Sequence, residues 1–173
     1  NVPGAVVVTE DSPQRTAHDL PAKSDVDTRS VYFTANVDFD QFSLTSYSGF
    51  RDEDVSVQND LDASSATLFG TIWAGYQTTR SQEVSIQSTN DGKLDWIAGL
   101  YYINDDSAIP DFRLEVAPNT TFRYISTFSA VESYSVFFNT TYNIVERLFL
   151  TAGLRYAYEE SNYKFIDAGN QKS

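Results

Sequence analysis

Side chains that could perform chemistry are few in this sequence of 173 residues. His18 is the only histidine, and it lies in a polar stretch before Pro21 with no visible partner for work as a base or a metal ligand. The chain has no cysteine, which excludes thiolate catalysis, disulfides and zinc sites built on cysteine. We therefore predict no catalytic residue, no metal site and no cofactor, and a protein that is not an enzyme.

Carboxylates are the most plentiful reactive groups, and they come in short runs at 52–54, 105–106 and 159–160. Carboxylate oxygens are the ligands that Ca²⁺ prefers, and "NDLDAS" at 59–64 faintly resembles a calcium-binding loop. It lacks the glycine and the closing glutamate of that motif. All these carboxylates fall where we expect loops to begin, so we predict that they are solvated.

The balance of acidic and basic residues limits the classes of partner that the protein can bind. With 24 acidic against 12 basic residues the net charge is −12, so nucleic acid is excluded as an expected partner because phosphate binding needs a basic stripe. Attachment to a membrane surface through basic residues is equally unsupported. Apolar residues make up 41% and aromatic residues 14% of the chain, a mixture that suits a sheet with one apolar and one wet side.

The elements that would position these groups are strands, because apolar and polar residues alternate in three segments. We predict hairpins at about 30–51, 79–104 and 131–160, with turns near 38–41, 90–93 and 143–147. Asp91-Gly92 is the strongest turn signal, since both residues tolerate the positive φ of a type I′ turn. Long loops are expected at 1–29, 52–78, 104–130 and 161–173, where the alternation fades.

The expected strands of about 10 to 12 residues are long for a soluble sheet, and they would cross an apolar band about 25 Å tall when tilted. Short turns at one end and long loops at the other are typical of outer-membrane barrels. No apolar run is long enough for a transmembrane helix. The fold class predicted is therefore all-β: an antiparallel transmembrane β-barrel segment of about six strands in three hairpins.

The alternation assigns side chains to two sides of this sheet. The residues predicted to meet lipid or to form an aromatic girdle are Trp96, Leu100, Tyr102, Phe138, Tyr142, Leu150, Leu154 and Tyr156. The residues predicted to face a lumen are Glu83, Gln87, Asn139, Thr151 and Arg155. Arg51 and Arg80 lie near the outer strand ends, where we expect them to pair with carboxylates or with the phosphates of lipopolysaccharide.

Three stretches resemble the barrels of TonB-dependent outer-membrane receptors. They are "LTSYSGFRDED" at 44–54, "RSQEVSIQSTNDGKLDWIAGLYYIND" at 80–105 and "YSVFFNTTYNIVERLFLTAGLRYAYEE" at 134–160. Their order and spacing agree with the family, and the resemblance covers about 30–160. The sequence departs from the pattern at Val84, where many members carry leucine followed by arginine.

The resemblance implies a segment of a 22-stranded barrel whose lumen is filled by an N-terminal plug. It also implies residence in the outer membrane of a Gram-negative bacterium, and energised uptake of a ferric siderophore, haem, cobalamin or an oligosaccharide. The implied partners are outer-membrane lipid and lipopolysaccharide, the rest of the barrel, the plug, and the TonB complex through an N-terminal box. Neither plug nor box is visible in this sequence, so we expect a middle segment of a longer chain.

Two other interpretations stay open at the level of sequence. A complete small barrel of about eight strands follows if "GAVVVTE" and "ATLFGTIWAGY" are both strands, and its role would be passive or structural. A soluble, secreted β-sandwich that binds sugars would show the same alternation, with a second sheet covering the apolar side.

Overall fold

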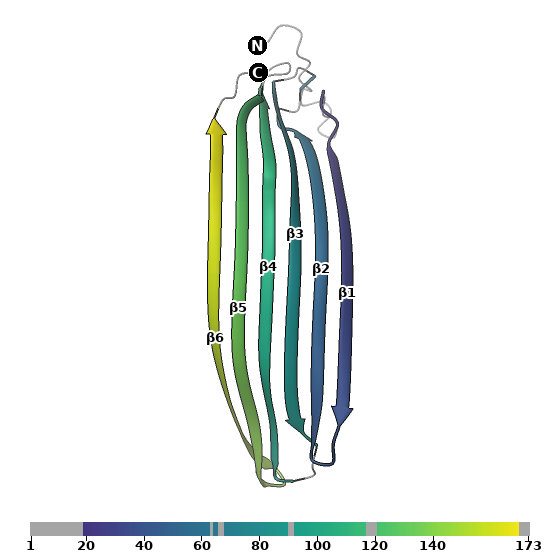
Figure 1. The fold of residues 1–173 in the computed structure, drawn as a ribbon, viewed down its shortest axis with the longest axis vertical. Helices are drawn as coiled ribbons and strands as arrows, with labels where there is room; N and C mark the ends of the chain where they lie inside the picture. Colours follow the sequence, from purple (N-terminus) through teal and green to yellow (C-terminus); the bar gives the residue numbers. More distant parts are fainter. Residues whose placement is uncertain (1–18, 63, 66–67, 90–91, 117–120, 170–173) are drawn as a thin grey trace.

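The computed structural model describes residues 19–62, 64–65, 68–89, 92–116 and 121–169. Six strands form one antiparallel sheet in which each strand pairs with the next along the chain (Figure 1). The strands are β1 (Lys23–Asp38), β2 (Phe42–Asp60), β3 (Phe69–Ser88), β4 (Leu94–Val116), β5 (Thr121–Val145) and β6 (Leu148–Gly169). The predicted all-β class with six antiparallel strands is confirmed. No helix capable of crossing a membrane occurs in the described part of the chain.

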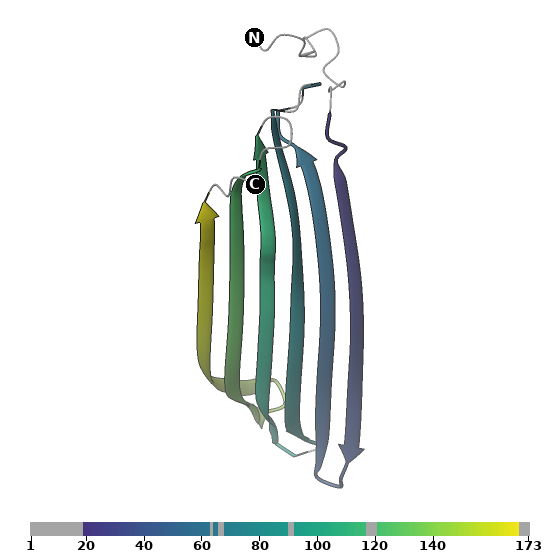
Figure 2. The same cartoon turned by 45° about the horizontal axis from the view of Figure 1, so that its top comes forward.

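The strand ends joined by the β1–β2, β3–β4 and β5–β6 connections lie at the same end of the sheet, as Figures 1 and 2 show. The first is the turn at 39–41, where the Phe39 amide donates to the Phe42 carbonyl oxygen at 2.9 Å, close to the turn predicted near 38–41. The β5–β6 turn lies at 146–147, inside the range predicted at 143–147. It is shorter than predicted because β5 continues to Val145 through a register shift between Asn143 and Val145. Asp91 of the predicted type I′ turn lies outside the described residues.

The predicted long loops are wrong in extent. Most of 52–78 belongs to β2 and β3, and most of 104–130 belongs to β4 and β5. At the two ends, 23–29 and 161–169 are also strand. For 52–60 and 104–109 the physical reason is that the strands satisfy their backbone hydrogen bonds by pairing with a neighbouring strand, without an apolar face to mark them in the sequence. Residues 1–18, with His18 and "GAVVVTE", lie outside the described residues.

One strand contains a proline that sequence reasoning treats as a sign of a loop. Pro110 lies within β4, where the pairing register with β5 shifts between Ile109 and Phe112. Proline has no N–H to donate, and a bulge is one of the few places in a sheet that tolerates this loss. The carbonyl oxygen of Pro110 accepts a hydrogen bond from the Ser126 hydroxyl at 2.6 Å, which ties the bulge to β5.

The sheet has no hydrophobic core of its own. Ala108 is the one buried apolar side chain in the described residues, and thirty large apolar or aromatic side chains are exposed. No second sheet packs against this one within the described ranges, so the β-sandwich interpretation is wrong for this part of the chain. Within the described residues the eight-stranded interpretation is not supported either, because 69–76 form no separate strand. They belong to the half of β3 that lies away from the turn at 39–41, which we call the outer half.

Candidate functional site

Cross-strand pairing sorts the side chains onto two faces, because paired residues and alternate residues along a strand share a face. One row of paired residues consists of Leu44, Ile86, Ala98, Phe138 and Leu154. We call the side on which this row lies the apolar face and the opposite side the polar face. The register places all the residues predicted to meet lipid or form a girdle on the apolar face: Trp96, Leu100, Tyr102, Phe138, Tyr142, Leu150, Leu154 and Tyr156. It places all those predicted to face a lumen on the polar face: Glu83, Gln87, Asn139, Thr151 and Arg155.

The apolar face carries a band of limited height. On β4 the band runs from Leu94 to Tyr102, which is about 26 Å along the strand and about 20 Å in height for a strand tilted by about 40°. Its upper edge is a row of three tyrosines formed by Tyr102, Tyr134 and Tyr158. The next row contains Asn104 and Glu132, so the apolar band ends abruptly at the tyrosines. Aromatic rows at the edges of an apolar band are typical of transmembrane barrels.

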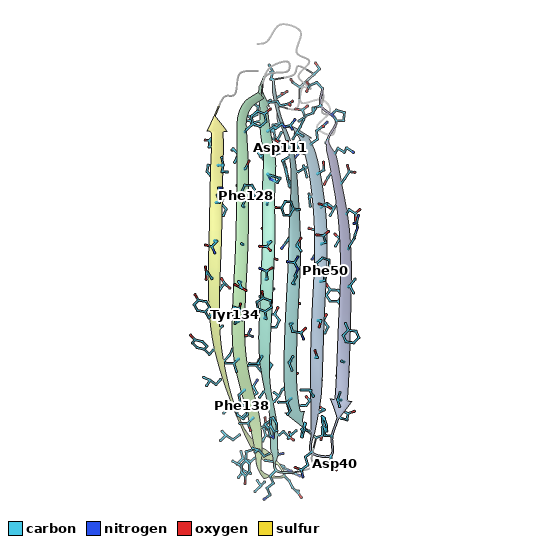
Figure 3. The ribbon with its side chains drawn as sticks, in the orientation of Figure 1. Asp40, Phe50, Asp111, Phe128, Tyr134 and Phe138 are labelled. Carbon is cyan, nitrogen blue, oxygen red and sulfur yellow. The ribbon has the colours of Figure 1, made fainter. Side chains whose placement is uncertain are left out.

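The tyrosine row has a polar and an apolar side. The rings of Tyr102 and Tyr134 lie with centroids 4.9 Å apart, and both hydroxyls donate to Oε1 of Glu132, at 3.0 and 2.6 Å. Figure 3 shows Tyr134 farther from the turn end than Phe138. Each ring thus lies within the apolar band while its hydroxyl reaches the polar row above, which is the arrangement favoured at a membrane–water interface.

Polar side chains within the band satisfy one another. The amide of Gln82 donates from Nε2 to the Ser46 hydroxyl at 3.0 Å, and its Oε1 accepts from the Ser48 hydroxyl at 2.6 Å. These three residues belong to neighbouring strands and lie on the apolar face. A polar group removed from water is costly unless it is hydrogen-bonded, so this mutual bonding is what an apolar environment requires.

The two faces differ in how far their side chains are exposed. On the apolar face of β5, Val136 and Phe138 are 47% and 45% exposed. On the polar face Ser135 is only 6% exposed, and its hydroxyl accepts a hydrogen bond from Nη2 of Arg155 at 3.0 Å. The side chains of the polar face therefore crowd one another more than those of the apolar face do, as expected if the polar face is the concave one.

Glycines on the polar face make room for larger neighbours. A Cβ added at Gly99 would clash with the ring of Phe137, which is its cross-strand partner on β5. A Cβ added at Gly153 would clash with the side chain of Asn139. At these two positions the side chain of the cross-strand partner therefore lies over glycine backbone.

The acidic runs do not lie in loops as predicted, because residues 52–54, 105–106 and 159–160 all belong to strands. Several of these carboxylates accept hydrogen bonds from the neighbouring strand. Asp105 accepts from the Gln77 amide at 2.8 Å and from the Thr79 hydroxyl at 2.7 Å, and Asp52 accepts from the Thr78 hydroxyl at 2.9 Å. In the outer part of the sheet, cross-strand hydrogen bonds between polar side chains thus take the place that contacts between apolar side chains would have in a core.

Three carboxylates meet at the β2–β3 connection, where Asp19, Asp60 and Asp62 have oxygens within 4.8 Å of one another. Asp62 organises this connection, since one of its oxygens accepts from the Ser64 amide at 2.9 Å and the other from the Leu68 and Phe69 amides at 3.2 and 2.8 Å. The Ser64 hydroxyl and these amides hold the pKa of Asp62 below its usual range. With its oxygens accepting these bonds, Asp62 caps the connection between β2 and β3.

Sequence reasoning missed a group of residues on the outer part of the apolar face. Tyr76, Phe128 and Lys164 lie there at paired or adjacent positions on β3, β5 and β6, in segments that the sequence predicts as loops. The alternation of aromatic and polar residues at 121–130 is the signal that would have placed Phe128 on a strand.

Comparisons with known proteins address the fold. No protein-family model matches this sequence, and no curated protein matches it either. The structure is similar to the crystal structure of the ferric yersiniabactin uptake receptor FyuA from Yersinia pestis, with a TM-score of 0.80 at 14% sequence identity. The match covers 90% of this chain and 24% of the FyuA chain, so this chain spans about a quarter of the length of that receptor. The chain therefore has the fold of about a quarter of the FyuA structure.

Proposed function

We propose that this chain is a barrel segment of a TonB-dependent receptor in the outer membrane of a Gram-negative bacterium. In this proposal the apolar face meets lipid and the polar face lines the lumen through which a scarce ligand is taken up. The remaining strands, the plug and the contact with the TonB complex come from other parts of the protein. The ligand belongs to the group of ferric siderophores, haem, cobalamin and oligosaccharides.

The observation that carries this proposal is the sorting of side chains by face and by height. A band about 20 Å high, bounded above by Tyr102, Tyr134 and Tyr158, covers one face only, and the described residues offer no protein layer to cover it. Phe138 and Leu150 are 45% and 63% exposed within this band. Exposed apolar surface of this extent requires a covering, and lipid chains fit its height and its aromatic edge.

Two further observations support the assignment of the lumen. The polar face is the more crowded one, as the concave side of a curved sheet should be, and Arg155 on this face donates a hydrogen bond to the Ser135 hydroxyl of the neighbouring strand. In the described sheet β1 and β6 each pair with one strand only, so each leaves one edge unpaired. Natural sheets rarely leave long edges open, so we expect further strands of the protein to pair with these two edges. The similarity to a ferric siderophore receptor supports the choice of an uptake role.

Spin labels placed on consecutive residues test which face meets lipid. The chain has no cysteine, so Phe138→Cys and Asn139→Cys each give one label within this segment. In the complete protein, reconstituted in outer-membrane lipids, the label at 138 should collide with dissolved oxygen, which partitions into lipid. The label at 139 should be protected from oxygen and, where the lumen holds water, should collide with a water-soluble nickel chelate. Equal oxygen collision at both positions, or the reverse order, would refute the assignment of the faces.

Uptake is tested with the gene that encodes the complete protein. Cells should accumulate one member of a panel of labelled ferric siderophores, haem, cobalamin and oligosaccharides, and accumulation should stop when the proton-motive force is collapsed. Removing 121–169, which contain β5 and β6, should abolish uptake. Uptake that continues after the membrane is de-energised would contradict a TonB-dependent role and would favour a passive one.

A further inference from the structure

Beyond the tyrosine row the two faces of the sheet exchange their character. The apolar face becomes charged there, as Asp52, Asp54 and Asp106 show. The polar face instead carries two successive cross-strand rows that are mostly apolar. One row contains Val57, Trp73, Phe112 and Ile125, and the next contains Val55, Ile109 and Phe165. The side of the sheet that we assign to the lumen therefore carries an apolar patch in its outer part, which we call the upper wall.

A hollow of about 330 Å³ lies at the lower edge of the upper wall, with Trp73, Val55 and Ile109 on its apolar side. That volume falls in the range of about 300 to 1,000 Å³ that is usual for small-ligand pockets. Gly75 lies within the lining, and a Cβ there would approach the Ala108 carbonyl oxygen to 2.8 Å. Cζ3 of the Trp73 ring lies 3.7 Å from the same position. The glycine thus lets the indole ring lie close to the backbone of the bulged strand β4.

The opposite side of the hollow is a row of hydrogen-bonding side chains that crosses the strands from β2 to β6. It consists of Glu53, Gln77, Ser107, Ser129 and Tyr163, each paired with the next. All of them line the hollow, and Asp105 lies one row closer to the apolar band. A ligand in the hollow therefore meets apolar surface on one side and hydroxyl, amide and carboxylate groups on the other.

Two carboxylates at the hollow keep an oxygen for a ligand. Glu53 accepts from the Thr28 hydroxyl at 2.9 Å and from the Arg51 guanidinium, both through Oε2. Asp105 accepts both of its bonds, at 2.8 and 2.7 Å, through Oδ2. Among the described residues no donor reaches Oε1 of Glu53 or Oδ1 of Asp105. An ionised carboxylate only accepts hydrogen bonds, so a ligand that uses these oxygens must supply the donors.

The charge around the hollow disfavours an anionic ligand. In the rows from Arg51 to Val57 the described side chains of the polar face carry three carboxylates, Glu53, Asp105 and Asp167, against the single cation Arg51. Hydrogen bonds from Arg51 and Thr28 hold the pKa of Glu53 below its usual range, so this carboxyl is ionised at neutral pH. An anionic ferric chelate or haem would be repelled here, whereas an uncharged ligand rich in hydroxyl groups would not.

The two aromatic rings of the hollow indicate a ligand of more than one ring. Trp73 on β3 and Tyr163 on β6 are three strands apart, which is about 14 Å across the sheet. A single sugar ring is too small to contact both, but a chain of sugar rings can. The C–H face of a sugar ring packs on an aromatic ring, while the hydroxyl groups at its edge donate to acceptors beside that ring. The arrangement of apolar and polar groups therefore matches an oligosaccharide.

We propose that this part of the barrel wall binds an uncharged oligosaccharide, with one sugar ring packed on Trp73 and hydroxyl groups donating to Glu53 and Asp105. The inference rests on the proposed function, because it requires that the polar face line the lumen. It selects one class among the ligands considered there and excludes anionic ferric siderophores and haem as ligands of this site.

A glycan array probed with the complete protein in detergent tests this site. The array presents uncharged oligosaccharides of hexoses and pentoses in increasing length. The glycan that binds most tightly is then titrated by calorimetry, beside a ferric tris-catecholate siderophore as the anionic probe.

The variants for this titration are Trp73→Leu and Glu53→Gln. The matched controls are Phe128→Leu and Asp54→Asn, which make the corresponding changes on the opposite face of the sheet. A heat-dependent shift in gel mobility reports a folded barrel in every sample. Glu53→Gln serves alone if Trp73→Leu fails to fold.

We expect at least one oligosaccharide of the array to bind, with a dissociation constant raised about tenfold or more by Trp73→Leu and about threefold or more by Glu53→Gln. Each control should change it by less than about twofold, and the ferric tris-catecholate should not bind at the same concentrations. A folded protein that binds no oligosaccharide, keeps its affinity in either variant, or binds the anionic chelate more tightly would overturn this site. Energised uptake of another ligand would in that case leave the proposed function standing. If the unmodified protein shows no heat-dependent mobility shift, the proposed function fails and the site fails with it.

Discussion

The position of a charge on one or the other face of the sheet should decide its effect on stability. Val84 and Ser85 are consecutive residues of β3, and the register places Val84 on the apolar face beside Leu100 and Ser85 on the polar face beside Gly99. Replacing each with arginine introduces the same side chain at the same depth. We expect Val84→Arg to destabilise the barrel strongly and Ser85→Arg to be nearly neutral.

The expected loss of stability follows from the depth of residue 84 within the apolar band. The row of Ile86 and Ala98 lies midway between Leu94 and Tyr102, and Val84 is two residues from it, which is about 5 Å in depth for a tilted strand. Arginine on the lipid face costs about 2 to 4 kcal/mol at the midplane and about 0 to 1 kcal/mol near the interface, so about 2 to 3 kcal/mol is expected at residue 84. At residue 85 the new guanidinium lies two residues from Glu83 on the same face, which favours it.

Reversible urea unfolding of the complete protein in phospholipid vesicles, followed by tryptophan fluorescence, measures both values. A loss of about 2 to 3 kcal/mol for Val84→Arg and less than about 1 kcal/mol for Ser85→Arg is the expected result. Equal losses at the two positions would mean that the faces do not differ in environment. A larger loss at residue 85 would mean that the apolar face is covered by protein or water and that the lumen has been assigned to the wrong side.

Two further outcomes follow from the contacts of single residues. Gly99→Ala should destabilise the barrel by about 1 to 3 kcal/mol because its Cβ meets the Phe137 ring, and Phe137→Leu should restore part of that loss in the same urea assay. Asp62→Asn should speed hydrogen exchange of the Ser64 and Phe69 amides at neutral pH, because the carboxylate accepts from both. Since the pKa of Asp62 is lowered in the folded protein, this protection is present above the usual value of 3.8 and is lost as the pH falls through the lowered value, where wild type and variant should exchange alike.

The sequence predicts the inner half of this fold because strands with one apolar and one polar face carry a period-two alternation. Phe138, Leu150 and Leu154 alternate with polar residues, and the register places them together on one face. The same alternation also fits a sandwich, so the sequence alone leaves open what covers the face. The single-layer sheet removes the sandwich from consideration in the described residues.

Much of the outer half of the sheet is not predicted from the sequence, because its strands are held by pairing with neighbouring strands instead of by burial of apolar side chains. Residues 52–60 and 104–109 carry polar or charged side chains on both faces, so no period-two apolar pattern marks them. What keeps them extended is the backbone ladder together with cross-strand bonds such as Gln77 and Thr79 to Asp105. A neighbouring strand supplies both, and sequence periodicity carries no information about which neighbour that is.

The same division explains why the outer part of the apolar face was predicted only in part. Arg80 is recognisable in the sequence as a cation near a strand end, but Lys164 is placed on the same face only by the register that carries β6 past β5. Residues 84 positions apart in the sequence therefore share one face only because the ladder continues beyond the apolar band. If the outer strands separated, the apolar band would keep its rows of paired side chains, while the outer residues would lose the neighbours that place them.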